Sequence, residues 1–240
     1  MSRTKIDWAD FSINPVKGLC PVACEYCYAR RMYKRFKWPE RIEFQYAHFR
    51  KSVSTIKKPS KIFVGSTMEL FGEWIMDRWL ADIFNVARLY PRHTFIFLTK
   101  KPENLQTWSP FPDNCWIGAS VTNMQMLDAA DLAMQEVEAN VKFLSFEPLL
   151  DHIGGPLRFP LSERFKAWQW LIIGQQTPIR AAAAPQVEWI REIVEAADKA
   201  KVPVFLKDNL SKLLQPIQGG LFVAKDVMKS DCWLRQEFPK

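Results

Sequence analysis

Residues 61–99 read KIFVGSTMELFGEWIMDRWLADIFNVARLYPRHTFIFLT and contain one complete strand-helix-strand pattern. The apolar runs at 61–66 and 94–99 are continuous rather than alternating, which is typical of strands buried on both faces. Between them, residues 76–89 place apolar side chains at helical spacing, with polar residues on the other face. Two parallel strands joined by such a helix form a right-handed crossover unit. The stretch therefore predicts an α/β fold.

The same alternation continues along most of the chain. Further apolar runs lie at residues 115–121, 141–146, 170–174 and 202–207, and a second amphipathic helix is expected at 186–201. With a strand before Cys20, this predicts a partial or complete (β/α) barrel of about six to eight parallel strands. An open doubly wound sheet is the alternative. Because no Gly- or Ser-rich linker divides the chain, we expect a single domain over residues 1–240 with a short C-terminal tail.

Composition and charge restrict the class of protein. The chain has 240 residues, of which 48% are hydrophobic, and no apolar run approaches the roughly 18 residues that cross a bilayer. Because the first residues also lack a secretory signal, we expect a cytoplasmic protein with no membrane partner. Residues 28–61 carry eleven Lys or Arg but two acidic residues, whereas the whole chain has a net charge of +7. This surplus favours an anionic substrate, a nucleic acid or a small molecule; the alternative is a solvated face neutralised from elsewhere in the fold.

Three of the five cysteines lie in one short segment, Cys20-Pro-Val-Ala-Cys24-Glu-Tyr-Cys27. This clustering and the odd total exclude a disulfide framework and favour thiolates kept for a metal. A [4Fe–4S] cluster held by three cysteines leaves one iron open to another ligand. The alternative is a zinc site, which needs a fourth ligand such as Cys115 or Cys232.

The spacing C-x3-C-x2-C, with the aromatic Tyr26 directly before the third cysteine, resembles the signature of radical S-adenosylmethionine enzymes. The resemblance extends to a phage and prokaryotic subfamily related to spore photoproduct lyase. It covers most of the chain, through the segments Ile6-Asp-Trp8, Asn14-Pro15, FVGSTMELF at 63–71, LTKKPE at 98–103, SFEP at 145–148 and VPVFLK at 202–207.

The resemblance implies a partial or complete (β/α) barrel and a defined set of cofactors. Cys20, Cys24 and Cys27 would hold a [4Fe–4S] cluster whose open iron binds S-adenosylmethionine, and Tyr26 would lie near the adenine. An external one-electron reductant would supply the electron that cleaves S-adenosylmethionine. The resulting 5′-deoxyadenosyl radical would abstract hydrogen from a substrate such as a nucleic acid or nucleotide. The alternative function is a metal-stabilised, non-catalytic nucleic-acid-binding protein.

The resemblance also implies residues that bind S-adenosylmethionine. Relatives carry Gly-Gly-Glu after the second strand, where this chain has Gly65-Ser66-Thr67-Met68-Glu69, so Ser66, Thr67 and Glu69 are expected to contact the methionine amino group. The alternative is that Ser66 and Thr67 only cap the next helix. Ser120 ends the next strand but one and is expected to contact the ribose or the methionine carboxylate, with a turn-forming role as the alternative.

Three further residues end later strands. Gly174 permits the close backbone approach that adenine binding needs, although Gln175-Gln-Thr177 replaces the Gly-Glu-Ser continuation that is common in relatives. Glu147 and Lys207 are expected to be catalytic or to contact substrate. Their structural alternative is an ion pair, in which Glu147 is the partner of Lys207.

Overall fold

The structure, a computed structural model, describes residues 3–154, 159–214, 220–223 and 234–239. Contacts divide the chain into two compact units, which are described separately. The first unit comprises residues 1–118 and 136–140, and the second comprises 119–135 and 141–240. The expectation that residues 1–240 form a single domain stays a prediction.

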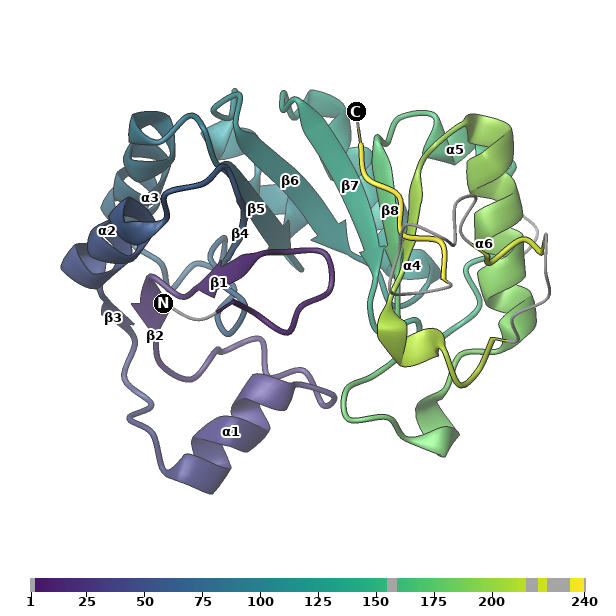
Figure 1. Cartoon of the computed structure of the whole chain (residues 1–240), viewed down its shortest axis with the longest axis horizontal. Coiled ribbons are helices and arrows are strands. Elements are labelled where there is room, and N and C mark those ends of the chain that lie inside the picture. Colours follow the sequence, from purple (N-terminus) through teal and green to yellow (C-terminus); the bar gives the residue numbers. More distant parts are fainter. Residues whose placement is uncertain (1–2, 155–158, 215–219, 224–233, 240) are drawn as a thin grey trace. The chain divides into compact units, whose positions relative to one another are not determined.

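Seven strands form one sheet in the order β1-β4-β5-β6-β7-β8-β9 (Figure 1). Their bounds are β1 Phe11–Ile13, β4 Lys61–Val64, β5 Thr94–Thr99, β6 Cys115–Ser120, β7 Val141–Phe146, β8 Trp170–Ile173 and β9 Val204–Leu206. The pairings of β1 with β4, β4 with β5, β7 with β8 and β8 with β9 are all parallel. Among the described residues β1 and β9 do not pair, so the predicted α/β barrel is confirmed in its partial form.

The first unit carries three helices and a small hairpin. The helices are α1 Tyr28–Phe36, α2 Tyr46–Thr55 and α3 Asp77–Leu89, and the hairpin strands are β2 Val16–Lys17 and β3 Glu43–Phe44. Figure 1 shows α2 and α3 side by side next to β4, with α1 apart from them. The cysteine segment lies between β2 and α1.

The second unit contains α4 Met124–Ala133, α5 Leu161–Phe165 and α6 Val187–Ala200, and α5 packs against α6. Near the C-terminus, Gln236 forms an antiparallel bridge with Phe205 in β9, and Phe238 packs against Trp170. Described residues near the C-terminus thus cover the edge strand of the sheet. Short 3-10 helices lie at Pro102–Asn104, Gln106–Trp108, Met134–Glu136, Ala181–Ala183 and Asp208–Leu210.

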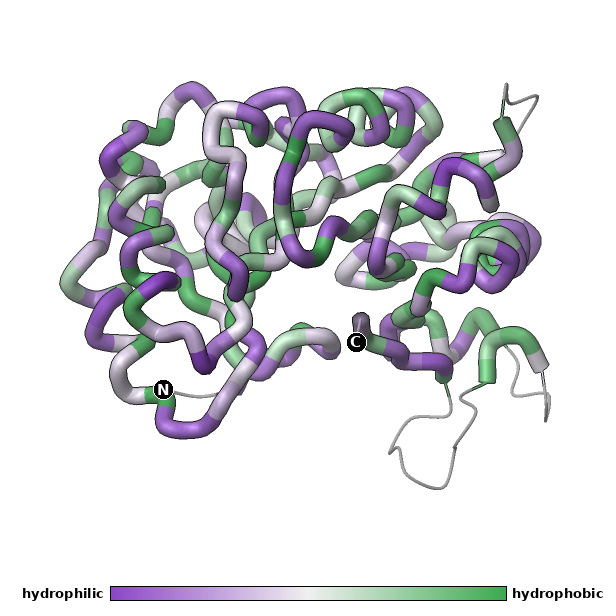
Figure 2. The backbone as a smooth tube through the Cα atoms, turned by 90° about the horizontal axis from the view of Figure 1, so that it is seen from above, coloured by the Kyte–Doolittle hydropathy of each residue, from purple (hydrophilic) through white to green (hydrophobic). Residues whose placement is uncertain are grey.

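The strands of the seven-stranded sheet and the helices α3 and α6 form where hydrophobic periodicity predicts them. All residues of β8 are buried, as expected for a strand covered on both faces. The expected helices at 76–89 and 186–201 correspond to α3 and α6, whose buried stripes include Ile83 and Ile193. The tube in Figure 2 changes between green and purple along the helices because each has an apolar and a polar face. The described residues include no helix long and apolar enough to cross a membrane.

Candidate functional site

The three clustered cysteines lie in the first unit and line one small hollow. Cys20, Cys24 and Cys27 are each partly exposed. The same hollow is lined by Arg30 from α1 and by Thr67 from the loop after β4. The folded loop therefore brings all three sulfur-bearing side chains to one surface, as the spacing predicts.

Backbone N–H groups point at two of the three sulfur atoms. Cys27 is the N-cap of α1, and its Sγ accepts a hydrogen bond from the Arg30 N–H at 3.4 Å. The sulfur of Cys20 accepts from the backbone N–H groups of Glu69 and Val22, although burial raises the pKa of this thiol. At Cys27 the donor and the helix N-terminus favour a sulfur that carries negative charge, whereas at Cys20 the effect of burial is larger than that of the donors.

Two arginines of α1 hold the cysteine loop in place. Arg30 donates to the carbonyl oxygen of Cys20 at 2.7 Å, and Arg31 donates to that of Tyr26 at 3.3 Å. Burial raises the pKa of the Tyr26 phenol, and the neighbouring Cys24 and Cys27 raise it further. Tyr26 is thus half-buried next to the cysteines of the loop.

Ser66 and Thr67 do not cap a helix, because α3 begins ten residues later and has Met76 at its N-cap. The Ser66 hydroxyl instead receives a hydrogen bond from Ser12 at 2.9 Å and donates to the Asn14 side chain at 3.2 Å. The same Asn14 oxygen accepts from the Thr67 backbone N–H. These contacts fasten the end of β4 to the end of β1, while the Thr67 hydroxyl has no hydrogen-bond partner among the described residues.

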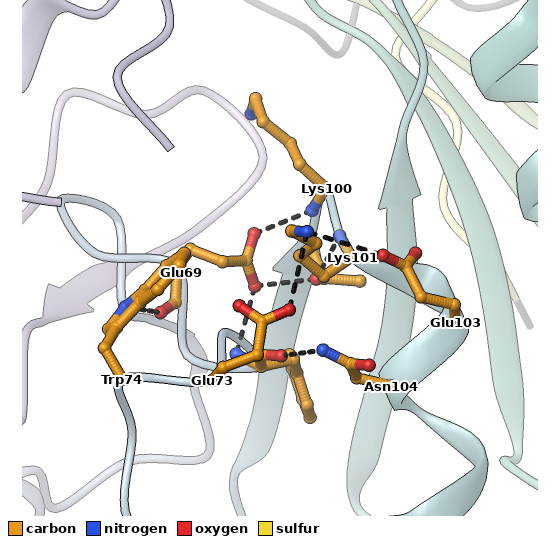
Figure 3. A network of polar contacts seen from close by, with 9 residues as sticks. Glu69, Glu73, Trp74, Lys100, Lys101, Glu103 and Asn104 are labelled. Atoms are coloured by element: carbon orange, nitrogen blue, oxygen red, sulfur yellow. Dashed lines mark hydrogen bonds and ion pairs between the residues drawn. The ribbon is translucent and has the colours of Figure 1, made fainter. Parts of the chain in front are cut away.

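Glu69 is buried and its carboxylate accepts three hydrogen bonds (Figure 3). The donors are the Thr99 hydroxyl at 2.6 Å, the Lys100 N–H at 2.7 Å and the Phe71 N–H at 3.0 Å. A carboxylate has about four acceptor sites, so most of its capacity is used within the protein. Glu69 therefore ties the loop after β4 to the end of β5.

The outer part of this network is more exposed. Figure 3 shows Lys101 between Glu73 and Glu103, to which its Nζ lies at 3.5 and 3.7 Å. The backbone N–H of Glu73 and, to a smaller extent, the Lys101 ammonium lower the pKa of Glu73. Because these side chains are solvated, they add little to stability.

No group of three or more His, Cys, Asp or Glu side chains among the described residues is already arranged around a metal-sized site. The zinc alternative needs a fourth protein ligand. Cys115 has no exposed surface in β6, and burial raises its pKa to about 12. Cys232 lies outside the described residues. The donor set of the loop is thus three partly exposed sulfurs, which fits a centre with three cysteine ligands.

The second unit joins Glu147, Gly174 and Lys207. Glu147 follows β7, Lys207 follows β9, and the Lys207 Nζ donates to the Glu147 carboxylate in a largely buried ion pair. This contact is the structural alternative that the sequence left open. Gly174 follows β8 between them, and a Cβ at this position would lie 2.9 Å from the Lys207 Cδ and 3.3 Å from the Glu147 Cγ. Glycine therefore makes room for the ion pair.

Gly174→Ala is expected to destabilise the protein by about 1–3 kcal/mol, because the new methyl group must displace the Lys207 stem. The midpoint of urea unfolding measures this change. Gly154→Ala is the matched control: the three atoms nearest to its Cβ all belong to the end of the half-exposed Glu192 side chain, which can move aside and give up its solvated ion pair with His152 at a cost below about 1 kcal/mol. Equal midpoints for the two variants would contradict this reading of Gly174.

The remaining strand-end residues are also engaged. Ser120 is buried at the end of β6, and Asn123 takes the turn-forming role because its side chain caps α4 at the Met126 N–H, 3.0 Å away. Gln175 is buried and exchanges hydrogen bonds with Asn209, whose Nδ2 donates to the Gln175 carbonyl at 2.7 Å. The sequence analysis did not predict that Asn209 is the partner of Gln175. Its position two residues after Lys207 places it in the loop that follows a strand, which is the one signal that could have identified it.

Comparisons with known proteins give one family and one distant structural likeness. The model of the family described as "Protein of unknown function (DUF5131)" matches residues 3–212. No curated protein matches the chain. Among solved structures, a mutant spore photoproduct lyase with bound AdoMet and dinucleoside spore photoproduct is similar at 12% identity and a TM-score of 0.48. The match covers 81% of this chain and 64% of that chain, and a likeness of this degree indicates nothing about the chemistry here.

Proposed function

Because the chain belongs to the family described as "Protein of unknown function (DUF5131)", we propose its function from its own residues: a radical S-adenosylmethionine enzyme that acts on an anionic substrate. The observation that carries the proposal is the placement of Cys20, Cys24 and Cys27 around one hollow. Three cysteines on one loop suit a [4Fe–4S] cluster with one iron left open. The sequence motif and the parallel α/β sheet agree with this assignment.

In this proposal Cys20, Cys24 and Cys27 hold the cluster as thiolates. When bound, the cluster would pass one electron from an external reductant to S-adenosylmethionine, so that a C–S bond of the sulfonium would break to give methionine and a 5′-deoxyadenosyl radical able to abstract hydrogen. Backbone N–H donors to the sulfurs of Cys20 and Cys27 stabilise their negative charge. Charge on the sulfurs and hydrogen bonds to them are among the features by which a protein adjusts the potential of such a cluster.

The other residues of the loop region would position S-adenosylmethionine. Thr67 is the best candidate for a direct contact, because it lines the hollow and its hydroxyl is without a partner among the described residues. Ser66 and Glu69 would act mainly by fixing the backbone around Thr67, since their own polar atoms are already bonded. Tyr26 would flank the cofactor from the cysteine loop.

The second unit would contribute polar groups at the ends of its strands. Glu147 and Lys207 form a largely buried ion pair whose charges are available to reorganise around an anionic substrate or ribose hydroxyls. Gly174 makes room for the side chains of this pair. The positive charge of residues 28–61 supports a nucleic acid or a nucleotide as the substrate.

The proposal is tested by anaerobic reconstitution with iron and sulfide, followed by reduction. We expect an electron paramagnetic resonance signal of a [4Fe–4S] cluster that changes when S-adenosylmethionine is added, and we expect formation of 5′-deoxyadenosine. The same protein loaded with zinc is the control and should form none. A cluster spectrum that is indifferent to S-adenosylmethionine would refute the enzyme and leave the metal-stabilised binding protein.

A further inference from the structure

One face of α1 is strongly basic and contains no acidic residue. Ala29 and Tyr33 are the buried residues of this helix; Arg31, Lys34 and Arg35 occupy the opposite half of its circumference, and Arg30 lies between the two halves. Like charges at i and i+4 destabilise a helix. A helix that only had to be solvated would more commonly mix acidic and basic residues on such a face.

The described residues do not supply acidic side chains that would neutralise this basic face from elsewhere in the fold. Arg30 and Arg31 donate to backbone carbonyl oxygens of the cysteine loop. Lys34, Arg35 and Lys37 are exposed and form no ion pair with any carboxylate that the structure describes. Lys34 and Lys37 therefore present their charge to solvent, whereas the Arg35 guanidinium lies over the Phe36 ring, 5.3 Å from its centroid.

Two aromatic rings lie exposed at the same end of the helix. The left-handed backbone of Lys37, at φ 51°, ends α1 and returns the chain so that Trp38 packs edge-on against Tyr33. Phe36 and Trp38 are stacked with 5.3 Å between ring centroids and 22° between ring planes. Phe36 is 51% exposed and Trp38 41% exposed, so the stacked pair forms a small apolar surface next to the basic side chains.

We propose that residues 34–38, here called the α1 face, form a binding surface for single-stranded nucleic acid. Lys34, Arg35 and Lys37 would contact phosphates, and the exposed Trp38 ring, which is supported by its stacking on Phe36, would stack on an unpaired base. Basic side chains interleaved with exposed aromatic rings are the combination that binds single strands with little sequence preference. In a duplex the bases are already stacked and leave no π-face for these rings, so single strands are favoured.

The α1 face lies on the same helix that Cys27 caps. At about 1.5 Å per residue, Phe36 lies about 13 Å along the helix from Cys27. A strand held on this face can thus extend to the cysteine loop within two or three nucleotides. The inference rests on the proposed function for its chemistry and names the substrate class of that site, but strand binding itself requires no cluster.

Fluorescence anisotropy with a labelled single-stranded DNA of about 12 nucleotides tests the proposal. The probe is titrated with the full chain, with and without the reconstituted cluster, at several salt concentrations. An equivalent RNA, the same DNA as a duplex, polyglutamate and phosphatidylglycerol vesicles are the competitors. We expect the single strands to bind at least tenfold more tightly than the others, on the order of the contribution of one stacked base.

Two pairs of variants separate charge from stacking. Lys34→Gln with Arg35→Gln should reduce the slope of log K against log salt by about 1.4, which corresponds to two lost phosphate contacts. Lys199→Gln with Lys212→Gln removes the same charge from exposed sites in the second unit and should leave binding unchanged. Trp38→Leu keeps the packing against Tyr33 but removes the ring and should weaken binding at least fivefold, whereas Trp38→Phe should preserve it.

The outcomes separate this inference from the proposed enzyme. Loss of binding in the α1 variants, with an unaltered cluster signal and unaltered response to S-adenosylmethionine, supports the α1 face. The proposal is overturned if duplex, polyglutamate or vesicles compete as well as the single strand, or if Trp38→Leu binds like the parent. A protein without radical activity that still binds single strands through the α1 face would refute the enzyme and retain this surface.

Discussion

Cys24→Ala is expected to abolish the [4Fe–4S] signal and the formation of 5′-deoxyadenosine. Cys24 is the middle member of the three cysteines that line one hollow of the first unit. Two remaining thiolates would leave two irons of a cubane without protein ligands, so the cluster would not be retained. Iron content after desalting, the paramagnetic resonance spectrum and chromatography of the nucleoside products measure the loss.

Cys115→Ala provides the matched control for this prediction. Cys115 is fully buried in β6 and the pKa of its thiol is raised to about 12, so it is suited to packing rather than to metal ligation. Its removal should lower stability slightly but leave iron content and product formation at parental levels. Equal loss of iron in both variants would instead indicate that Cys115 is a fourth ligand, as the zinc alternative requires.

Glu69→Gln is expected to lower the free energy of unfolding by about 3 kcal/mol, even in protein without cofactors. The amide replaces one acceptor oxygen by a donor, which must face either the Lys100 N–H or the donors Thr99 and Phe71. At least one buried N–H or O–H then loses its charged acceptor. Urea unfolding of the cofactor-free protein measures the effect.

Glu73→Gln is the control for the Glu69 prediction. Glu73 lies four residues later at the exposed edge of the same network, where its ion pair with Lys101 is solvated (Figure 3). Its substitution should leave the unfolding midpoint unchanged. A Glu69→Gln protein of parental stability that binds S-adenosylmethionine more weakly would show that Glu69 acts on the cofactor and not on the loop.

The strands and the helices α3 and α6 could be predicted from the sequence because their signals are local. Continuous apolar runs identify buried strands, and apolar residues at helical spacing identify amphipathic helices. Helix α1 was not predicted, because its buried stripe consists of Ala29 and Tyr33 within a run of charged residues. The cysteine loop, like these strands, could be recognised from the sequence, since its three thiols lie within eight residues and need no distant partner.

The polar contacts of the candidate site depended on the tertiary structure. Glu69 bonds to Thr99 thirty residues away, and Lys207 pairs with Glu147 sixty residues away. Such partners meet because parallel strands place their carboxyl ends at one edge of a sheet, and the order of strands is not encoded in any single segment. The sequence by itself determined that three thiols lie on one short loop, because their spacing is local. The tertiary structure decided which carboxylates and hydroxyls are already bonded, because that depends on which strand ends become neighbours.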